Sequence, residues 1–313
     1  MSISSLAASS DIQGYYYAAG ACVSLYSGAL FAASTLLRRT KGMAVNPNPT
    51  TQPKLKSTAL SAARYRHFEV ESVAQSAHNA VTIRFKLPSS DMVLGLPIGR
   101  HISVRATTVP SSGSTNVEQV VRSYTPVSPP GTKGFFDLLV RVYDGGKMSQ
   151  HLAALQPGDT VEMRGPIGSM KYEANKHRKG GIGLIGAGSG VTPLLQMAYG
   201  VLDNSNDHTP IALLMQNREE RDVLMKDEIS ALAERAQIAN KSFSTTFALS
   251  KPTECTSPTH VRGYLTAGVL QDKLPSPGPH TLVCLCGPDA FVSAMEYILL
   301  RKLGYESSML HIF

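Results

Sequence analysis

The spacing of hydrophobic and polar positions changes twice along the chain and divides it into three regions. Residues 18–37 form an apolar run without charges, residues 65–164 contain short runs of alternating apolar and polar positions, and the region after Gly180 combines apolar runs with helical spacing. Alternation indicates strands, and apolar positions three and four apart indicate helices. We therefore expect an N-terminal apolar helix, then an antiparallel β-barrel, and then an α/β domain.

The middle region predicts six short strands. Glycine, proline, serine and asparagine fill the gaps between the alternating runs, as turns between strands require, and this pattern is typical of a small antiparallel barrel. One helical pattern, Met148–Leu155, interrupts the series. The predicted strands are Phe68–Val73, Ala80–Leu87, His101–Ala106, Val117–Thr125, Phe135–Tyr143 and Thr160–Arg164.

The last region predicts a parallel sheet with helices between its strands. Apolar runs alternate with helical patterns, of which Leu224–Gln237 is the clearest, and this order is typical of α/β domains. The polar run Glu173–Lys179 separates this region from the barrel. We place the three parts at residues 1–62, 63–175 and 180–313. The predicted strands are 182–186, 211–216, 243–249 and 281–286.

The N-terminal run has the properties of a membrane anchor. Ala18–Leu37 contains 20 uncharged residues, about the length that crosses a bilayer as a helix. Tyr15–Tyr17 precede the run and Arg38 and Arg39 follow it, as aromatic and basic residues flank membrane spans. We predict a single span over about 15–37. A cleaved signal or a matrix transit peptide is disfavoured because no Lys or Arg precedes Arg38. A disordered Ala/Ser-rich tail is the alternative.

The positive charge is concentrated beside this anchor. Seven Lys or Arg residues lie between Arg38 and Arg66, and together with Asp11 they supply +6 of the formal net charge of +7. The positive-inside rule then predicts that the body faces the cytosol, from the mitochondrial outer membrane or the endoplasmic reticulum. The body itself is nearly neutral, which excludes a general affinity for nucleic acid. Four scattered cysteines predict a reducing compartment and no metal site.

A glycine-rich turn in Gly183–Pro193 predicts a phosphate-binding loop. An apolar run ends in Gly186-Ala-Gly188-Ser-Gly190, and a helical pattern follows. Such a loop directs backbone N–H groups toward one point, which suits a phosphate. The third glycine comes one place earlier than in the usual dinucleotide fingerprint. A tight strand-to-helix turn without a ligand is the alternative.

Four further motifs carry groups that suit a dinucleotide. Arg122-Ser-Tyr-Thr-Pro-Val-Ser128 offers a forked cation, a flat ring and a hydroxyl. Gly145-Gly-Lys-Met-Ser149 offers backbone N–H groups and a hydroxyl, or alternatively a helix capped by Ser149 with nothing bound. Gly165-Pro-Ile-Gly168 ends the barrel in a turn, and Cys286-Gly-Pro288 places a thiol at a strand end.

The five motifs in this order resemble the ferredoxin–NADP reductase superfamily of flavoproteins, and most closely the NADH–cytochrome b5 reductases. The resemblance covers residues 65–313. It implies an enzyme that takes a hydride from NAD(P)H onto FAD and passes single electrons to a haem protein, cytochrome b5. A reductase for another acceptor (a ferredoxin, a quinone or an oxygenase partner) is one alternative. A membrane-tethered binding module without flavin is another.

The resemblance also implies roles for individual residues. The barrel would bind FAD, with Thr125 near flavin N5, and the α/β domain would bind the nicotinamide cofactor, with Cys286 beside its ring; these two are the predicted catalytic residues. Phe313 resembles the aromatic end of many members. The FAD-side residues are Arg122, Tyr124, Thr125, Arg141, Tyr143, Gly146, Lys147, Met148 and Ser149. The nicotinamide-side residues are Gly186, Gly188, Gly190, Thr192, Pro193, Ser250, Gly287 and Pro288.

One position departs from the resembled family. Those reductases usually have an acidic residue after the third strand of the nicotinamide domain, where this chain has Ser250 followed by Lys251. A carboxylate repels a 2′-phosphate, whereas a hydroxyl beside a cation tolerates it. The hypothesis is that the preference for NADH over NADPH is weakened.

Overall fold

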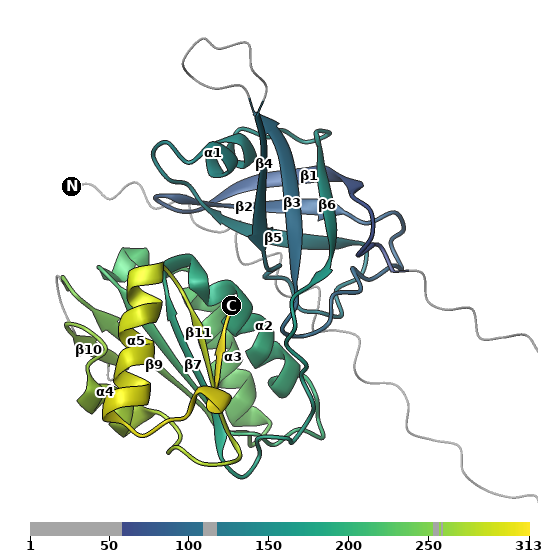
Figure 1. Cartoon of the computed structure of the whole chain (residues 1–313). Helices are drawn as coiled ribbons and strands as arrows, with labels where there is room; N and C mark the ends of the chain where they lie inside the picture. The colour runs from purple at the N-terminus through teal and green to yellow at the C-terminus, as the bar shows by residue number, and fades with distance from the viewer. Residues whose placement is uncertain (1–57, 109–117, 253–256, 258) are drawn as a thin grey trace, which may run out of the picture. The chain divides into compact units, whose positions relative to one another are not determined.

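The computed structural model describes residues 58–108, 118–252, 257 and 259–313. They belong to one compact unit, Lys54–Phe313, which contains two six-stranded sheets (Figure 1). The predicted N-terminal span lies outside the described residues. Among those described, no helix combines the length and the apolar character that crossing a membrane requires.

The first sheet is antiparallel throughout, as the alternation predicts. Its strand order is β4-β3-β6-β1-β2-β5, and helix α1 (Lys147–Ala153) covers one side of its core through the buried Leu152. Phe68 and Phe85 both pack on Phe136, each with ring centroids 5.3 Å apart. The strands are β1 Arg66–Ala77, β2 Ala80–Lys86, β3 His101–Thr108, β4 Glu118–Tyr124, β5 Phe135–Arg141 and β6 Thr160–Ile167.

The second sheet is parallel, which confirms the α/β prediction. Its order is β10-β9-β8-β7-β11-β12. Successive residues of one strand face opposite sides: Leu184 packs in the core with helices α2 and α3, and Ile185 packs in the core with α4 and α5. The strands are β7 Gly181–Ala187, β8 Ile211–Asn217, β9 Phe243–Leu249, β10 His260–Arg262, β11 Thr281–Cys286 and β12 Leu310–Ile312. The helices are α2 Val191–Leu202, α3 Lys226–Ile238, α4 Ala267–Lys273 and α5 Asp289–Lys302.

Several predicted boundaries are wrong for identifiable reasons. Helix α3 begins at Lys226 rather than at Leu224, because Met225 has a left-handed φ of 58° that starts the helix abruptly. Strand β1 continues past Val73 to Ala77, because it stays paired with β2 through register shifts. Strands β10 and β12 have three residues each and follow no long alternating run. Short 3-10 turns, η3 Gly188–Gly190, η4 Glu220–Asp222 and η5 Ser307–Met309, also escaped prediction.

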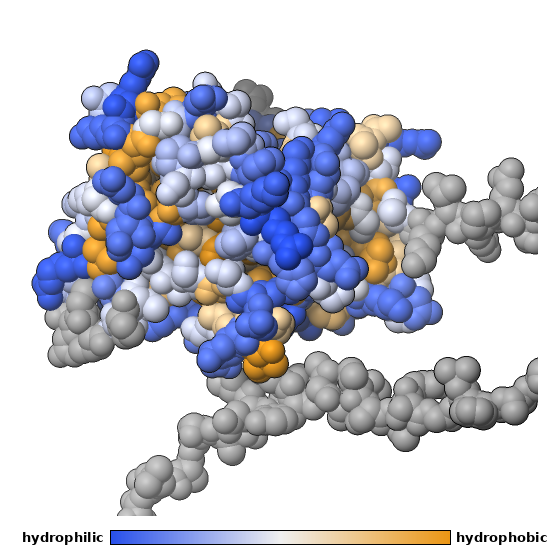
Figure 2. Space-filling view, turned by 90° about the horizontal axis from the view of Figure 1, so that it is seen from below, coloured by the Kyte–Doolittle hydropathy of each residue, from blue (hydrophilic) through white to orange (hydrophobic). Residues whose placement is uncertain are grey.

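A buried glutamine on α2 connects the two sheets. Gln196 accepts a hydrogen bond from the N–H of Gly99 at 2.7 Å and donates to the carbonyl of Arg100 at 3.1 Å. Ile98 packs against Gly200, where an added β-carbon would come within 2.9 Å of it. Ile98, Gly99 and Arg100 directly precede β3, so these contacts fix α2 against the antiparallel domain. On the surface seen in Figure 2, hydrophobic residues are scattered among hydrophilic ones.

Candidate functional site

A cavity of about 1160 Å³ is lined by residues of both sheets. The antiparallel domain contributes the end of β4, the end of β5 and the start of α1, and the α/β domain contributes the carboxyl ends of β7, β8, β9 and β11. Ligands of open α/β sheets bind at this edge of the strands. The volume exceeds the roughly 300–1000 Å³ of a usual small-molecule pocket. It has room for a flavin and a nicotinamide cofactor.

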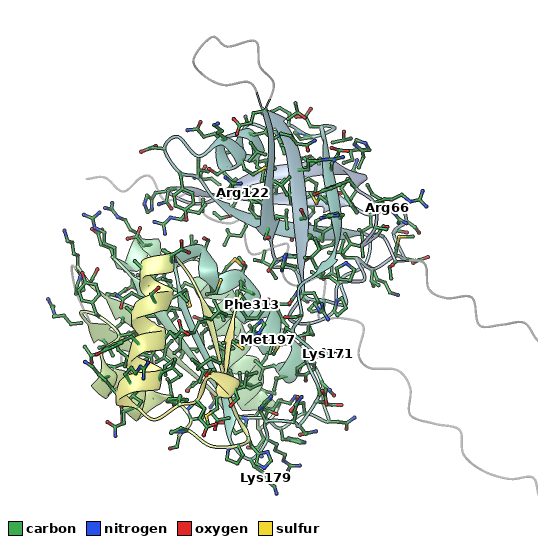
Figure 3. The ribbon with its side chains drawn as sticks, viewed as in Figure 1. Arg66, Arg122, Lys171, Lys179, Met197 and Phe313 are labelled. Carbon is green, nitrogen blue, oxygen red and sulfur yellow. The ribbon has the colours of Figure 1, made fainter. Side chains whose placement is uncertain are left out.

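The cavity brings together nearly all of the residues that the sequence singled out. Gly186 is the exception: an added β-carbon there would lie 2.6 Å from Leu194 and 2.9 Å from the sulfur of Met215, so this glycine serves packing. Arg122, on β4, and Phe313, at the C-terminus, are labelled in Figure 3. The predicted residues that line the cavity are Arg122, Tyr124, Thr125, Arg141, Tyr143, Gly146, Lys147, Met148, Ser149, Gly188, Gly190, Thr192, Pro193, Ser250, Cys286, Gly287, Pro288 and Phe313.

On the antiparallel side, the end of β4 carries an exposed cation followed by two partly or fully buried hydroxyl groups. Arg122 is exposed, Tyr124 is half-buried and Thr125 is buried. Burial raises the pKa of the Tyr124 phenol to about 12, so the ring is neutral at physiological pH. A neutral aromatic face beside a buried hydroxyl suits the edge of a flat heteroaromatic ring. The guanidinium of Arg122, two residues before Tyr124 on the same strand, suits phosphate oxygens.

Ser149 closes the turn between β5 and α1. Its hydroxyl donates to the carbonyl of Gly146 at 3.0 Å and accepts from the N–H of Tyr143 at 3.2 Å. The residue at the cap position of α1 is Gly146, and it makes no side-chain cap bond. The alternative reading of Ser149 as a helix cap is therefore wrong. The hydroxyl instead holds a glycine turn in shape at the cavity wall, while Lys147 pairs with Glu118 of β4.

On the α/β side, two glycines permit a close approach of backbones. Gly188 has a left-handed φ of +54°, which favours glycine. A β-carbon on Gly190 would stand 2.2 Å from the carbonyl oxygen of Cys286. The loop after β7 is thus held directly against the end of β11, and this contact brings Thr192 and Cys286 to the same cavity.

The two strand cysteines differ in their surroundings. Cys286 is half-buried at the cavity, and burial raises the pKa of its thiol to about 11. Cys284 lies two residues earlier on the same face of β11 and is fully buried in the core, which raises its pKa to about 12. Both thiols are therefore neutral at physiological pH, and Cys286 can contact a ligand as a small soft group rather than as a nucleophile.

Sequence reasoning missed a second set of lining residues. His78, in the turn between β1 and β2, has its Nε2 3.4 Å from the carboxylate of Asp222 on η4. A turn histidine carries no pattern by which it could be found. The segment after β8 could have been found, since it follows the carboxyl end of a parallel strand. The missed lining residues include His78, Asn79, His101, Gln216, Asn217, Arg218, Glu219, Arg221, Asp222 and Tyr264.

The residues present fit a dinucleotide flavin. Glycines lie where side chains would fill the cradle, and neutral Tyr124 and Thr125 lie beside cationic Arg122. On the α/β wall of the cavity, the amide nitrogen of Asn217 is buried and has no acceptor among the described residues. A buried donor without a partner is costly, and a bound polar group relieves that cost.

Comparison with known proteins gives matches over both domains. The model of the oxidoreductase FAD-binding domain matches residues 67–172, and that of the oxidoreductase NAD-binding domain matches residues 184–296. NADH-cytochrome b5 reductase 1 of Dictyostelium discoideum is 35% identical over 255 residues, 82% of this chain and 84% of the relative. The protein of the same name from Ajellomyces capsulatus is 38% identical over 80% of this chain and 77% of the relative.

A solved structure agrees with these matches. The cytochrome b5 reductase domain of Ulva prolifera nitrate reductase superposes with a TM-score of 0.73 at 29% identity. The match covers 82% of this chain and 100% of that domain.

Proposed function

The chain belongs to the NADH–cytochrome b5 reductase family, and from this premise we propose that it oxidises NADH through a bound FAD and reduces cytochrome b5. One observation carries the proposal. The cavity places Tyr124 and Thr125 of the antiparallel domain together with Thr192 and Cys286 of the α/β domain. A flavin on the first pair and a nicotinamide on the second would share one space, as direct hydride transfer requires.

The protein contributes binding, orientation and exclusion of water. When bound, FAD accepts two electrons with the hydride of NADH and can give them up one at a time. Arg122 offers its guanidinium to the pyrophosphate, and the turn held by Ser149 offers backbone N–H groups to the phosphates. Thr125 is buried and supplies a hydroxyl at the ring. Cys286 would lie beside the nicotinamide as a neutral thiol, and half-buried Phe313 lines the same cavity.

The proposed electron acceptor is a haem protein, cytochrome b5. The chain has four cysteines, Cys22, Cys255, Cys284 and Cys286, and their spacing does not resemble an iron–sulfur motif. Electrons would leave the bound FAD for a haem protein that docks at the cavity. A ferredoxin, a quinone or an oxygenase partner is the alternative acceptor class, and direct assay distinguishes them.

The test is a stopped-flow experiment with the purified flavoprotein. Mixing with NADH should bleach the flavin, and adding oxidised cytochrome b5 should then produce prompt haem reduction. Bleaching without haem reduction would replace cytochrome b5 by another acceptor. A protein that purifies without flavin, or whose flavin NADH does not bleach, would contradict the enzyme assignment.

We also propose that the N-terminal apolar run anchors the enzyme in the mitochondrial outer membrane or the endoplasmic reticulum with the body toward the cytosol. Support comes from the 20 uncharged residues of Ala18–Leu37 and the cations that follow them. The test is carbonate extraction and protease protection of the full chain. Replacing Leu30 and Phe31 by Arg should release the protein, since each central Arg costs about 2.5–3.5 kcal/mol of insertion free energy. Extraction of the unaltered chain by carbonate would contradict the anchor.

A further inference from the structure

We propose that the segments following β8 and β9 form a cationic subsite for a 2′-phosphate, so that the cavity accepts NADPH as well as NADH. This inference rests on the proposed function and names a further substrate of the same cavity. It concerns four residues, Asn217, Arg218, Ser250 and Lys251, which we call the strand-end cluster.

The backbone brings the four residues together. Strands β8 and β9 are parallel neighbours, with Asn217 opposite Leu249. Beyond that pair, the N–H of Ser250 donates to the carbonyl of Asn217 at 3.1 Å, and the N–H of Lys251 donates to the carbonyl of Arg218 at 2.7 Å. The two segments therefore leave the sheet side by side, and Arg218 and Lys251 come from adjacent positions. Asn217, Arg218 and Ser250 line the cavity.

Within the described residues, the two cations of the cluster have no counter-charge. Arg218 and Lys251 are exposed, and within the described part of the chain neither side chain has a hydrogen-bond or ion-pair partner. An uncompensated pair of cations at a cavity wall attracts an anion, and guanidinium is the side chain best matched to phosphate.

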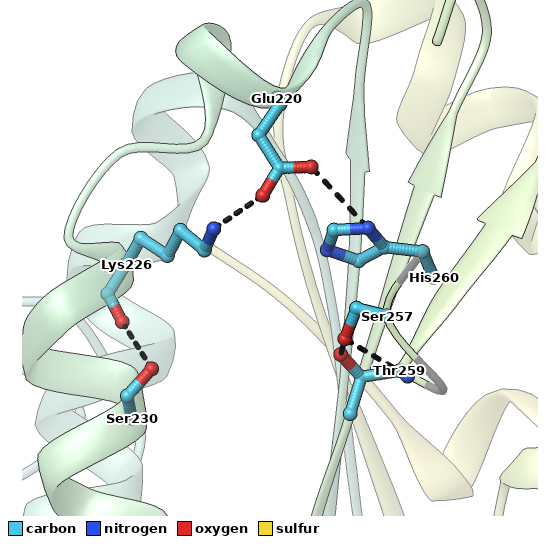
Figure 4. A network of polar contacts seen from close by, with 6 residues as sticks. All are labelled: Glu220, Lys226, Ser230, Ser257, Thr259 and His260. Atoms are coloured by element: carbon cyan, nitrogen blue, oxygen red, sulfur yellow. Dashed lines mark hydrogen bonds and ion pairs between the residues drawn. The ribbon is translucent and has the colours of Figure 1, made fainter. Parts of the chain in front are cut away.

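The neighbouring carboxylates are each engaged elsewhere. Glu219 is 2.8 Å from the Nε of Arg221 and also accepts from the backbone of η4. Asp222 faces His78 at 3.4 Å. Glu220 is held by Lys226 and, at 3.2 Å, by the ring of His260, as Figure 4 shows. Among the described residues, no carboxylate therefore balances Arg218 or Lys251 at this edge.

Asn217 supplies a second, independent sign of a ligand. Asn217 is 7% exposed, and among the described residues its amide Nδ2 has no acceptor. The adjacent Gln216 is satisfied by the backbone, since its Oε1 accepts from Leu265 at 2.8 Å and its amide donates to the carbonyls of Ala248 and Gly263. The unused donor of Asn217 at the cavity wall is thus open to a ligand oxygen.

Ser250 determines whether the site discriminates between NADH and NADPH. It is half-buried at the cavity, at the end of a parallel strand, where dinucleotide-binding sheets present either a carboxylate to a ribose 2′-hydroxyl or a cation to a 2′-phosphate. A carboxylate here would repel the doubly charged phosphate. A hydroxyl donates a hydrogen bond to either group, so the site admits both nucleotides, and the two cations favour the phosphorylated one.

The test separates binding from catalysis. Calorimetric titration of the FAD-loaded full chain with 5′-AMP and with adenosine 2′,5′-bisphosphate measures the contribution of the 2′-phosphate without any redox step. We expect the bisphosphate to bind about tenfold or more tightly than 5′-AMP, because charged hydrogen bonds to phosphate are worth that much, and the difference should shrink at high salt. Stopped-flow bleaching with NADPH should then approach the rate with NADH.

Three variants locate the effect. Ser250→Asp should reverse the preference between the two nucleotides, and Arg218→Gln with Lys251→Gln should lower bisphosphate affinity more than 5′-AMP affinity. Arg301→Gln, an exposed cation on α5 outside the cavity lining, is the matched control and should change neither. If Ser250→Asp loses its flavin, the Arg218–Lys251 double variant decides.

The outcomes distinguish the two proposals. Equal or weaker binding of the bisphosphate by the unaltered protein, while NADH still bleaches the flavin, overturns this inference and leaves the reductase in place. Absence of bleaching with both nucleotides overturns the reductase itself.

Discussion

The Nη1 atom of Arg141 lies 2.6 Å from the point where a β-carbon on Gly188 would stand. Arg141 ends β5 of the antiparallel sheet, and Gly188 follows β7 of the parallel sheet with a left-handed φ of +54°. A guanidinium from one domain therefore covers the bare backbone of the glycine loop in the other. Glycine is needed here for two separate reasons, its conformation and the room that it leaves for Arg141.

Gly188→Ala should weaken NADH binding while FAD is retained. The substitution imposes roughly 1–2 kcal/mol of backbone strain and displaces Arg141 from the cavity wall. We expect the KM for NADH to rise about tenfold, a change of about 1.4 kcal/mol, in steady-state assays. Gly304→Ala is the control, because Gly304 has a similar φ of +75° with open space around it. An equal rise of KM in the control would mean that strain alone, rather than the contact with Arg141, is responsible.

Ser149→Ala should loosen the hold on FAD. The change removes both hydrogen bonds that fix the turn from Tyr143 to Ser149, each worth about 1 kcal/mol. Equilibrium dialysis should show FAD affinity reduced about tenfold or more, with the fold intact by circular dichroism. Ser128→Ala is the control: it removes a serine hydroxyl that accepts from the N–H of Asp137 and that lies outside the large cavity, so FAD affinity should not change. Full flavin retention in Ser149→Ala would remove this turn from the FAD site.

The hydrophobic pattern predicted the strands well where it extended over a whole element. Seven-residue strands such as β5 and β9 lie close to their predicted positions, because one period ran over the whole element. The start of α3 was missed because the left-handed Met225 carries no mark in the hydrophobic pattern. The three-residue β10 and β12 pair with longer neighbours, and pairing depends on tertiary contacts rather than on local sequence.

The candidate site was predictable where chemistry follows local motifs. Arg122 and Ser149 lie in short sequence motifs whose side chains suit contacts with a phosphate or a ring, and both residues line the cavity. Gly186 was grouped with the other loop glycines, yet its neighbours show a packing role. His78 and Asp222 are 144 positions apart in the sequence, and no local spacing predicts that they meet. Long-range pairs of this kind require the structure.

Acid should destabilise the protein through Asp207. This carboxylate is buried, which by itself raises its pKa, but hydrogen bonds from Thr209 and Tyr172 outweigh burial and hold the pKa below its usual range. A lowered pKa in the folded state stabilises the fold above the unfolded value, and this contribution is lost as pH falls through the folded value. Asp207→Asn should therefore unfold more easily at pH 7, by about 1–3 kcal/mol, and lose less stability between pH 5 and pH 2.

Urea titrations at several pH values measure this difference. Asp203→Asn removes a partly exposed carboxylate that pairs with Arg235 and should change stability little, as surface pairs do. A parallel acid dependence in Asp207→Asn and the unaltered protein would assign the acid sensitivity to other groups.

Cys286→Ala should slow flavin reduction by NADH and leave FAD bound. The side chain lies at the cavity where the loop of Gly190 meets β11, and its loss leaves space beside the nicotinamide. Because burial raises the thiol pKa to about 11, the thiol stays protonated between pH 6 and 9, and the reduction rate should show no titration of this group there.

Single-turnover stopped flow should give a rate lowered about tenfold through poorer positioning, with Cys286→Ser intermediate. Cys284→Ala, two residues earlier on the same strand, buried in the core and outside the cavity lining, should leave the rate unchanged. If Cys286→Ala instead loses its flavin, Cys286 supports the FAD domain rather than the nicotinamide.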